Sequence, residues 1–212
     1  MTQLRRPIEA VLDRQHACPS GIVGRLVGER MVRQHGPETL WTVTLLGIER
    51  EDRVLEIGFG AGRAVELVAA RATDGHVAGV DLSRTMVRAA ARRNRRAVAA
   101  GRVALRQGDV MALPYPDGQF DKALSIHTLY FWPDPERALA EIYRVLRPGG
   151  RVALTLSPGT VGEEEDAGYR ITVDERIIPA MEHVGFSTAR VEPGPDSRQF
   201  RTVAVFGIKR QG

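Results

Sequence analysis

The chain has a single cysteine, Cys18, among its 212 residues, so it can form no internal disulfide and no zinc site built from cysteines. It also lacks an apolar run long enough to cross a membrane. The charged residues Arg5, Arg6 and Glu9 interrupt the start of the chain, where a signal peptide would need an apolar stretch. We therefore expect a cytoplasmic protein without a membrane span.

Lysine is nearly absent as well. Of the 30 basic residues all but Lys122 and Lys209 are arginine, and the formal net charge is +4. The arginines are spread over the whole chain and alternate with acidic residues, whereas a nucleic-acid-binding surface needs a clustered patch or stripe. The sequence therefore predicts no nucleic-acid partner.

The chain contains no internal repeat, and 212 residues with 43% hydrophobic content suit one well-packed domain. After Glu51, short and nearly continuous apolar runs, typical of strands covered on both faces, alternate with longer runs of helical spacing. This alternation predicts a doubly wound α/β fold with a mostly parallel sheet. The predicted strands are Arg53–Ile57, His76–Val80, Val103–Gln107, Phe120–Ile126 and Arg151–Leu156, and the predicted helices are Ala64–Arg71, Arg84–Ala100 and Pro135–Leu146.

The last third of the chain departs from this alternation. Pro148–Gly150 is predicted to end the third helix and to lead into the fifth strand. A further helix over Asp174–Val184 contains Pro179, which indicates a kink or a later start. Two final strands, Ser187–Val191 and Arg201–Ile208, are close enough for a hairpin with an antiparallel edge.

Residues 1–45 form a separate segment in the prediction. Gly21–Gln34 places apolar residues on one side of a helix and charged residues on the other. We interpret this helix as one that packs on the core or as a lid over a ligand site; its three glycines argue against a role in membrane binding. The predicted organisation is an N-terminal helical segment at 1–45 and a core domain at 46–212.

The first predicted strand runs into Gly58, Gly60 and Gly62, within the sequence VLEIGFGAGR. In an open parallel sheet ligands bind beyond the carboxyl ends of the strands. Glycines there allow a ligand to lie against the backbone, and the following helix N-terminus favours an anionic group. Because Arg63 follows a G-x-G-x-G pattern, the dinucleotide spacing G-x-G-x-x-G is not met, which disfavours a nicotinamide-dependent oxidoreductase.

Two carboxylates follow the next two strands. Asp81 lies 19 residues after Gly62 and can accept hydrogen bonds from both hydroxyls of a ribose. Asp109 can accept from an adenine amino group. The alternative for each is to cap a helix or close a turn, although Ser83 is better placed to cap the helix after Asp81.

Taken together, the stretches LEIGFGAG, GVDLS, QGDV and FDKALSIHTLYFWPDPERALAEIYRVLRPGG resemble the class I S-adenosylmethionine-dependent methyltransferases, particularly their small-molecule, ubiquinone-biosynthesis-like branch. The resemblance is close over residues 50–157. It implies a seven-stranded sheet of order 3-2-1-4-5-7-6 with the last strand antiparallel. It also implies S-adenosylmethionine as methyl donor and S-adenosylhomocysteine as product.

The resemblance also implies roles for residues at or just after the ends of the first four predicted strands. The implied cofactor-binding residues are Glu56, Gly58, Gly60 and Gly62 at the methionine end, Asp81 at the ribose, Leu82, Met86, Asp109 and Val110 at the adenine, and Ser125 near the sulfonium. His127 would approach the sulfonium and its methyl group. It is either a general base for a hydroxyl or acidic carbon, or a histidine that shapes the pocket.

Other chemistry-bearing residues are less specific. Tyr130, Phe131 and Trp132 would face a ring-bearing acceptor or pack on a helix. The acidic run Glu163–Asp166 would suit a hard cation, but such runs are typical of solvated loops, so we predict no metal. The sequence thus predicts in-line methyl transfer to an oxygen, carbon or nitrogen of a small molecule, the alternative being a binding module that retains the cofactor pocket without catalysis.

Overall fold

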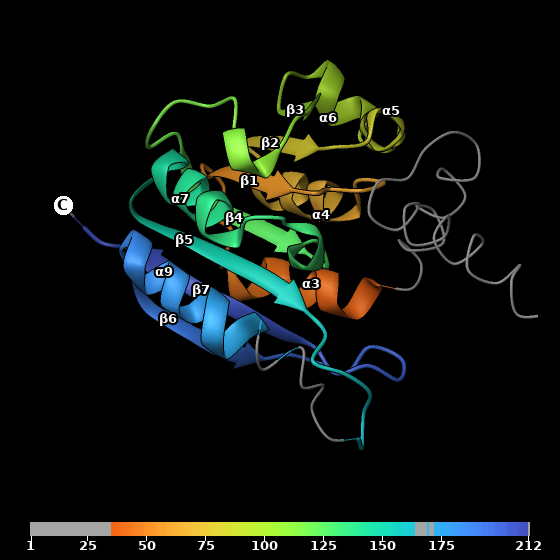
Figure 1. The fold of residues 1–212 in the computed structure, drawn as a ribbon. Helices are drawn as coiled ribbons and strands as arrows, with labels where there is room; N and C mark the ends of the chain where they lie inside the picture. The colour runs from red at the N-terminus through yellow and green to blue at the C-terminus, as the bar shows by residue number, and fades with distance from the viewer. Residues whose placement is uncertain (1–34, 164–168, 170–171, 212) are drawn as a thin grey trace, which may run out of the picture.

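The computed structural model describes residues 35–163, 169 and 172–211. These form a seven-stranded sheet of order β3-β2-β1-β4-β5-β7-β6 with helices on both faces (Figure 1). The pairs of neighbouring strands from β3 to β5 are parallel, and β7 runs antiparallel to both β5 and β6. The predicted fold and strand order are therefore confirmed. The strands are β1 (Arg53–Ile57), β2 (His76–Asp81), β3 (Val103–Gln107), β4 (Phe120–Ile126), β5 (Leu146–Leu156), β6 (Phe186–Pro193) and β7 (Val203–Lys209).

Each face of the sheet has its own apolar layer. In β1, Val54 packs with α4 residues such as Val65 on one face, and Leu55 packs with α7 residues such as Leu139 on the other. Burial on both faces explains why the parallel strands read as continuous apolar runs. The first face carries α3 (Gly36–Leu45), α4 (Arg63–Arg71), α5 (Arg84–Arg93) and α6 (Arg95–Ala99), and the second carries η3 (Val173–Ile177), α7 (Pro135–Val145) and α9 (Ile178–Val184).

The chain reverses its direction of winding at β1, which has β2 on one side and β4 on the other. The connections after these three parallel strands diverge at their carboxyl ends, which is where doubly wound sheets bind ligands. Two short 3₁₀ helices, η1 (Val110–Ala112) and η2 (Leu129–Phe131), follow β3 and β4 at this edge. The fold thus brings the predicted site residues to a single rim.

The fifth strand begins five residues before its predicted start at Arg151. Leu146 already pairs with Phe120, and the register then shifts so that Arg151 pairs with Lys122. The residues between, including Gly149 at a φ of 76°, bulge out of the ladder. Pro148–Gly150 therefore interrupts the pairing within β5 and does not precede the strand.

The single helix predicted over Arg84–Ala100 is in fact two helices, α5 and α6, separated at Asn94. The buried Asn94 side chain donates from Nδ2 to the carbonyl oxygens of Gly62 and Ala90, at 3.0 Å each. Asparagine side chains compete with the backbone for such carbonyls, which favours a break in the helix. Asn94 thereby ties the end of α5 to the start of α4.

The helix predicted over Asp174–Val184 begins as the π-helical turn η3 and continues as α9 from Ile178. Pro179 lies in the first turn of α9, directly after the π-helical turn, so the backbone before it is already helical. The α-helix itself begins at Ile178, which agrees with the later start, one of the two alternatives for Pro179.

The N-terminal segment is described only from His35 onward, so the amphipathic helix predicted over Gly21–Gln34 lies outside the described residues. Helix α3 packs on the sheet: Val43 is buried in the core, and Thr42 Oγ1 lies 2.7 Å from Thr155 Oγ1 of β5. Within the described ranges, none of the helices has the length and apolar character needed to cross a lipid bilayer.

Candidate functional site

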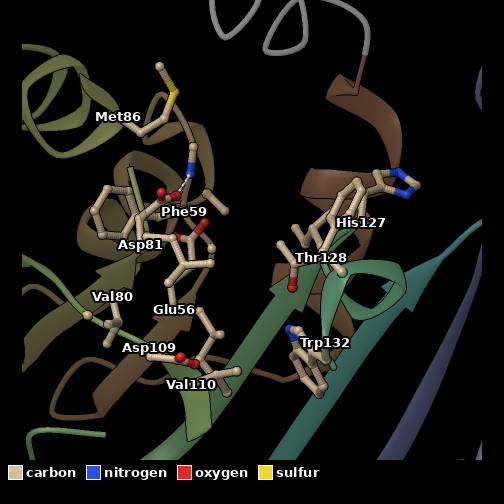
Figure 2. Close-up of a pocket in the computed structure, with 18 of the residues that line it drawn as sticks. Glu56, Phe59, Val80, Asp81, Met86, Asp109, Val110, His127, Thr128 and Trp132 are labelled. Atoms are coloured by element: carbon tan, nitrogen blue, oxygen red, sulfur yellow. Dashed lines mark hydrogen bonds between the residues drawn. The ribbon is translucent and has the colours of Figure 1, made fainter. Parts of the chain in front are cut away.

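A cavity lies at the carboxyl ends of β1, β2 and β4. Figure 2 shows Glu56, Asp81 and Asp109 on one side of it and His127 and Trp132 on the other. The residues of the sequence prediction that line this first cavity are Glu56, Gly58, Gly60, Asp81, Leu82, Met86, Asp109, Val110 and His127. These residues are far apart in the sequence, and the family resemblance implies that they bind one ligand. In the structure they line one cavity.

The three glycines after β1 meet different structural needs. A Cβ on Gly58 would lie 2.3 Å from Thr128 Cγ2, and a Cβ on Gly62 would lie 2.6 Å from that of Ala90, so these positions are closed by packing. At Gly60 no described atom lies within 4 Å of an added Cβ. Gly60 therefore exposes bare backbone to the cavity, whereas Gly62 is the N-cap of α4 and lies behind it.

Asp81 ends β2 and is 9% exposed. Its Oδ2 accepts from Gly60 N at 2.9 Å and its Oδ1 from Ser83 N at 2.8 Å. Burial raises the pKa of Asp81 to about 6, although both backbone hydrogen bonds act to lower it. The cap of α5 is Ser83, whose Oγ accepts from Met86 N at 3.2 Å. Each carboxylate oxygen of Asp81 thus keeps a lone pair for a further donor from a ligand.

Glu56 lies in β1 and is 4% exposed. Its Oε2 is buried and meets no hydrogen-bond donor among the described residues. Burial raises the pKa of Glu56 well above its usual value, and the nearby charge of Asp81 raises it further. A buried polar atom without a partner is costly in a folded protein. A cationic or hydroxyl group of a ligand in the cavity would satisfy it.

Asp109 caps a turn, as its alternative role predicts, and it also lines the first cavity. Its Oδ1 accepts from Met111 N at 2.9 Å and so caps η1, while its side chain also lines the cavity. Val110 lies beside it. The apolar part of the wall comes from Leu82, which is 51% exposed at the rim, and from Met86, which is 1% exposed. Apolar side chains and the Asp109 carboxylate therefore share this part of the cavity wall.

Ser125 is buried in β4 and does not line the first cavity. Its Oγ donates to the carbonyl oxygen of Ile57 at 3.0 Å and contacts Thr128 Oγ1. Thr128 does line the cavity, opposite the carboxylates (Figure 2). Ser125 therefore supports the wall through Thr128.

His127 follows β4 with a φ of 56°, a left-handed conformation that is uncommon outside glycine. Its Nε2 lies 3.4 Å from Oε1 of Glu38, and Nδ1 of His35 lies 2.5 Å from the same oxygen. Glu38 is 1% exposed. Burial favours its neutral form, but hydrogen bonds from His127, His35 and Ser197 outweigh burial and hold the pKa of Glu38 below its usual range.

A second cavity adjoins the first, and His35 and His127 line both. The aromatic cluster is divided between them: Trp132 lines the first cavity and belongs to the core, whereas Tyr130 lines the second. The Tyr130 hydroxyl accepts from Ser157 N at 2.7 Å, which fixes the ring. The site is therefore a pair of adjoining pockets with a histidine pair at their junction.

Three residues at this junction, His35, Glu38 and Thr128, carry no motif that sequence reasoning would find. The spacing of His35 and Glu38 at the start of a helix is the one available signal, because residues three apart share a helix face. The contact between Glu38 and His127 spans 89 residues and depends on how α3 packs against β4 and β5. That packing cannot be read from a local pattern.

Comparison with known proteins identifies the family. Residues 55–154 match the family described as "Methyltransferase domain". The chain is 36% identical over 169 residues to the uncharacterized methyltransferase YdaC of Bacillus subtilis, a match that covers 79% of this chain and 89% of that protein. It is 38% identical over 141 residues to the 27-O-demethylrifamycin SV methyltransferase of Amycolatopsis mediterranei, covering 65% of this chain and about half (51%) of the relative.

The fold agrees with this assignment. The crystal structure of an S-adenosylmethionine-dependent methyltransferase from Aquifex aeolicus superposes with a TM-score of 0.68 at 18% identity, covering 85% of this chain and 97% of the other. The narrower expectation of a ubiquinone-biosynthesis-like branch stays a prediction. By its sequence relatives and its sheet, this chain is an enzyme of the class I S-adenosylmethionine-dependent methyltransferase family.

Proposed function

We propose that this methyltransferase transfers a methyl group to an oxygen, carbon or nitrogen atom of a small-molecule acceptor by in-line displacement. The observation that carries the proposal is the pair of adjoining cavities that share His35 and His127. The first offers a glycine loop and three carboxylates to the donor, and the second leaves room for an acceptor. The name of the Amycolatopsis relative, a methyltransferase for a demethylrifamycin, supports an acceptor of this class.

The residues of the first cavity fit S-adenosylmethionine at three points. Asp81 would accept from the ribose hydroxyls, because its side chain lines the cavity and both of its oxygens are already oriented by backbone N–H groups. Asp109 would accept from the adenine amino group, with Leu82 and Met86 against the ring faces. Glu56 would receive the ammonium group of the methionine moiety, which would satisfy its unpartnered Oε2.

The chain's own contribution to catalysis would be position and exclusion of water. When bound, S-adenosylmethionine supplies a methyl group that its sulfonium already activates. Effective molarities for well-oriented reactants correspond to about 7–11 kcal/mol of barrier, so holding the acceptor beside the methyl accounts for much of the rate. Because the donor is activated without a Lewis acid, the proposed transfer uses no metal ion.

Two further expectations belong to this proposal. The division into an N-terminal helical segment at 1–45 and a core domain at 46–212 stays a prediction, and so do the two alternative roles of that segment, packing on the core or covering a ligand site. The cytoplasmic location stays a prediction that rests on the single cysteine.

Two measurements test the proposed function. Isothermal titration calorimetry with S-adenosylmethionine and NAD should show binding of the first alone. Release of S-adenosylhomocysteine should then be screened with hydroxyl-, amine- and carbon-nucleophile acceptors of low molecular weight. Turnover of at least one acceptor is the expected result. Tight donor binding without turnover across the panel would instead favour a non-catalytic binding module, and preference for NAD would overturn the proposal.

A further inference from the structure

Glu38 is a buried carboxylate at the junction of the two cavities, and nothing in the methyl-donor site uses it. Its Oε1 lies 2.5 Å from His35 Nδ1 and 3.4 Å from His127 Nε2. An ionised carboxylate can only accept hydrogen bonds, so His127 must carry its proton on Nε2 to satisfy this contact. In the neutral ring this leaves Nδ1 of His127 as the acceptor.

We propose that Glu38 is a positioning residue that holds His127 as the proton acceptor for a phenolic hydroxyl bound in the second cavity. This inference rests on the proposed function and narrows its acceptor to an O–H nucleophile on an aromatic ring. Glu38 acts through His127, which lines both cavities and so touches the space where donor and acceptor meet.

The lining of the second cavity favours an aromatic acceptor. Tyr130 and Phe200 offer ring surfaces, and Leu156 adds an apolar side chain. A phenol has a pKa near 10, as tyrosine does, so it is mostly protonated at neutral pH and needs a base before it attacks. The titratable and charged groups that line this cavity beside Glu38 and His127 are His35, Tyr130, Tyr169, Arg198 and Arg201.

The backbone of His127 is an independent sign of a functional constraint. Its φ of 56° is a conformation that costs energy for a residue with a side chain, and such residues concentrate at active sites. The conformation directs the chain out of β4 so that the ring lies within 4.6 Å, centroid to centroid, of His35. The 3.4 Å contact with Glu38 is long, as hydrogen bonds of catalytic bases often are before substrate binds.

The acceptor oxygen forms a bond to the methyl carbon while the carbon–sulfur bond of the donor breaks, and the electron pair of that bond stays on sulfur. The hydroxyl proton passes to Nδ1 of His127. The ring then carries a proton on each nitrogen, and the ionised Glu38 stabilises this cation until the proton leaves to solvent.

His35, Glu38 and His127 could instead ligate a metal ion. The distances between their atoms distinguish a metal site from a set of hydrogen bonds. Ligand atoms 2.0–2.1 Å from a tetrahedral zinc ion are about 3.3 Å apart. His127 Nε2 and Glu38 Oε1 meet that separation, but His35 Nδ1 and Glu38 Oε1, at 2.5 Å, are as close as atoms that share a proton. The geometry therefore favours the proton, and a metal is an outcome of the test.

The first arm of the test needs no acceptor. Nitrogen-15 NMR of the imidazole rings in the full-length protein should show His127 as the Nε2–H tautomer, its signals being assigned by their loss in His127→Gln. Glu38→Leu should abolish the tautomer preference, and Glu38→Gln should keep it because the amide oxygen still accepts. An Nδ1–H tautomer in the native protein, or a preference that survives Glu38→Leu, overturns the inference.

The second arm compares 4-ethylphenol with 4-ethylbenzenethiol as acceptor probes, because the thiol is largely ionised near neutral pH and needs no base. Glu38→Leu and His127→Gln should slow methylation of the phenol by about 100-fold or more while that of the thiol changes less than about threefold. The matched control is Glu136→Gln, since Glu136 faces His183 at 3.6 Å in an exposed pair away from both cavities. It should alter neither rate.

Donor affinity separates this inference from the proposed function. Calorimetry should give the same S-adenosylmethionine affinity for Glu38→Leu as for the native protein, whereas a native protein that binds no donor refutes the proposed function itself. Equal losses for phenol and thiol, or native turnover of the thiol alone, overturn the role of Glu38. So does loss of phenol methylation in EDTA that zinc ions restore, which would make the cluster a metal site.

Discussion

The carboxylate of Asp81 at the end of β2 accepts a hydrogen bond of 2.9 Å from the backbone N–H of Gly60, in the loop after β1. This contact fixes the acidic side chain against the one glycine of that loop whose backbone faces open space. A ligand that bridges the two strand ends therefore meets bare main chain and a carboxylate side by side. The two residues together define where the donor's ribose and methionine moieties would lie.

Asp81 should make donor binding depend on pH. Burial raises the pKa of Asp81 to about 6, so in the free protein the side chain is protonated below that pH and ionised above it. Ribose hydroxyls donate to the ionised form, so S-adenosylmethionine affinity should rise as pH rises through about 6 and fall below it. Asp81→Asn should remove the part of this dependence that is centred near pH 6, and Asp81→Ala should weaken binding by about 1–3 kcal/mol, or 5–150-fold. Calorimetry between pH 5 and 8 measures both, and a pH profile identical in native and Asp81→Asn protein would place the ribose elsewhere.

Glu56 should release a proton when the donor binds. Burial raises its pKa well above the usual value, which favours the neutral side chain in the free protein. An ammonium group at Oε2 favours the ionised form, and the proton then goes to solvent. Calorimetry in buffers of different ionisation enthalpy should show net proton release when the donor binds. Glu56→Gln should bind more weakly and release none; undiminished proton release in that variant would rule out Glu56 as the source.

The rim position of these carboxylates could be predicted from the sequence because Glu56 and Asp81 lie at or near the ends of apolar runs, and the carboxyl ends of parallel strands share one rim. The pKa values and hydrogen-bond partners of these side chains could not be predicted in this way. Whether Asp81 caps a helix or faces a ligand depends on Ser83 taking the cap, and the unpartnered state of Glu56 Oε2 depends on side chains from several elements. A local sequence pattern predicts which residue lies at the rim of the sheet. Tertiary packing determines which atoms its side chain contacts.

Gly62 should be required for two reasons: its left-handed backbone conformation, and the close packing of α5 against it. An added Cβ would lie 2.6 Å from Ala90 Cβ and 2.8 Å from Asn94 Nδ2, at a φ of 81°. Gly101 is the matched control, since it has a φ of 72° and no described atom within 4 Å of an added Cβ. Gly62→Ala should lower the free energy of unfolding by about 1–3 kcal/mol more than Gly101→Ala, because overpacking adds to the backbone cost. Urea denaturation measures the difference, and equal losses would show that α4 and α5 move apart freely.

A buried ion pair at the opposite end of the sheet should affect stability without affecting the site. Lys122 Nζ donates to Asp52 Oδ2 and, at 2.6 Å, to the carbonyl oxygen of Gly47, and both charged side chains are 7% exposed. Asp52→Ala leaves a buried cation without its partner and should cost about 3–5 kcal/mol of unfolding free energy. The double variant with Lys122→Met should recover much of that loss. Donor affinity, measured where the variants remain folded, should be unchanged; a parallel loss of affinity would show that the two ends of the sheet are coupled.

The cluster of Glu38, His35 and His127 could not be predicted as a unit from the sequence. His127 could be singled out because it follows a predicted strand at the rim. Glu38 could not, because it precedes every strand and reaches the site only through the packing of α3, for which Val43 and Thr42 supply the contacts. The break between α5 and α6 was missed for a similar reason, since Asn94 acts through a carbonyl of the glycine loop that is remote in sequence.

The most direct test of the account is a crystal structure of the protein with S-adenosylhomocysteine. The account predicts the ribose hydroxyls at the Asp81 carboxylate, the adenine between Leu82 and Met86 with its amino group toward Asp109, and the amino acid moiety against Gly60 and Glu56. A ligand bound away from the carboxyl ends of β1 and β2, or held by none of these three carboxylates, would contradict it.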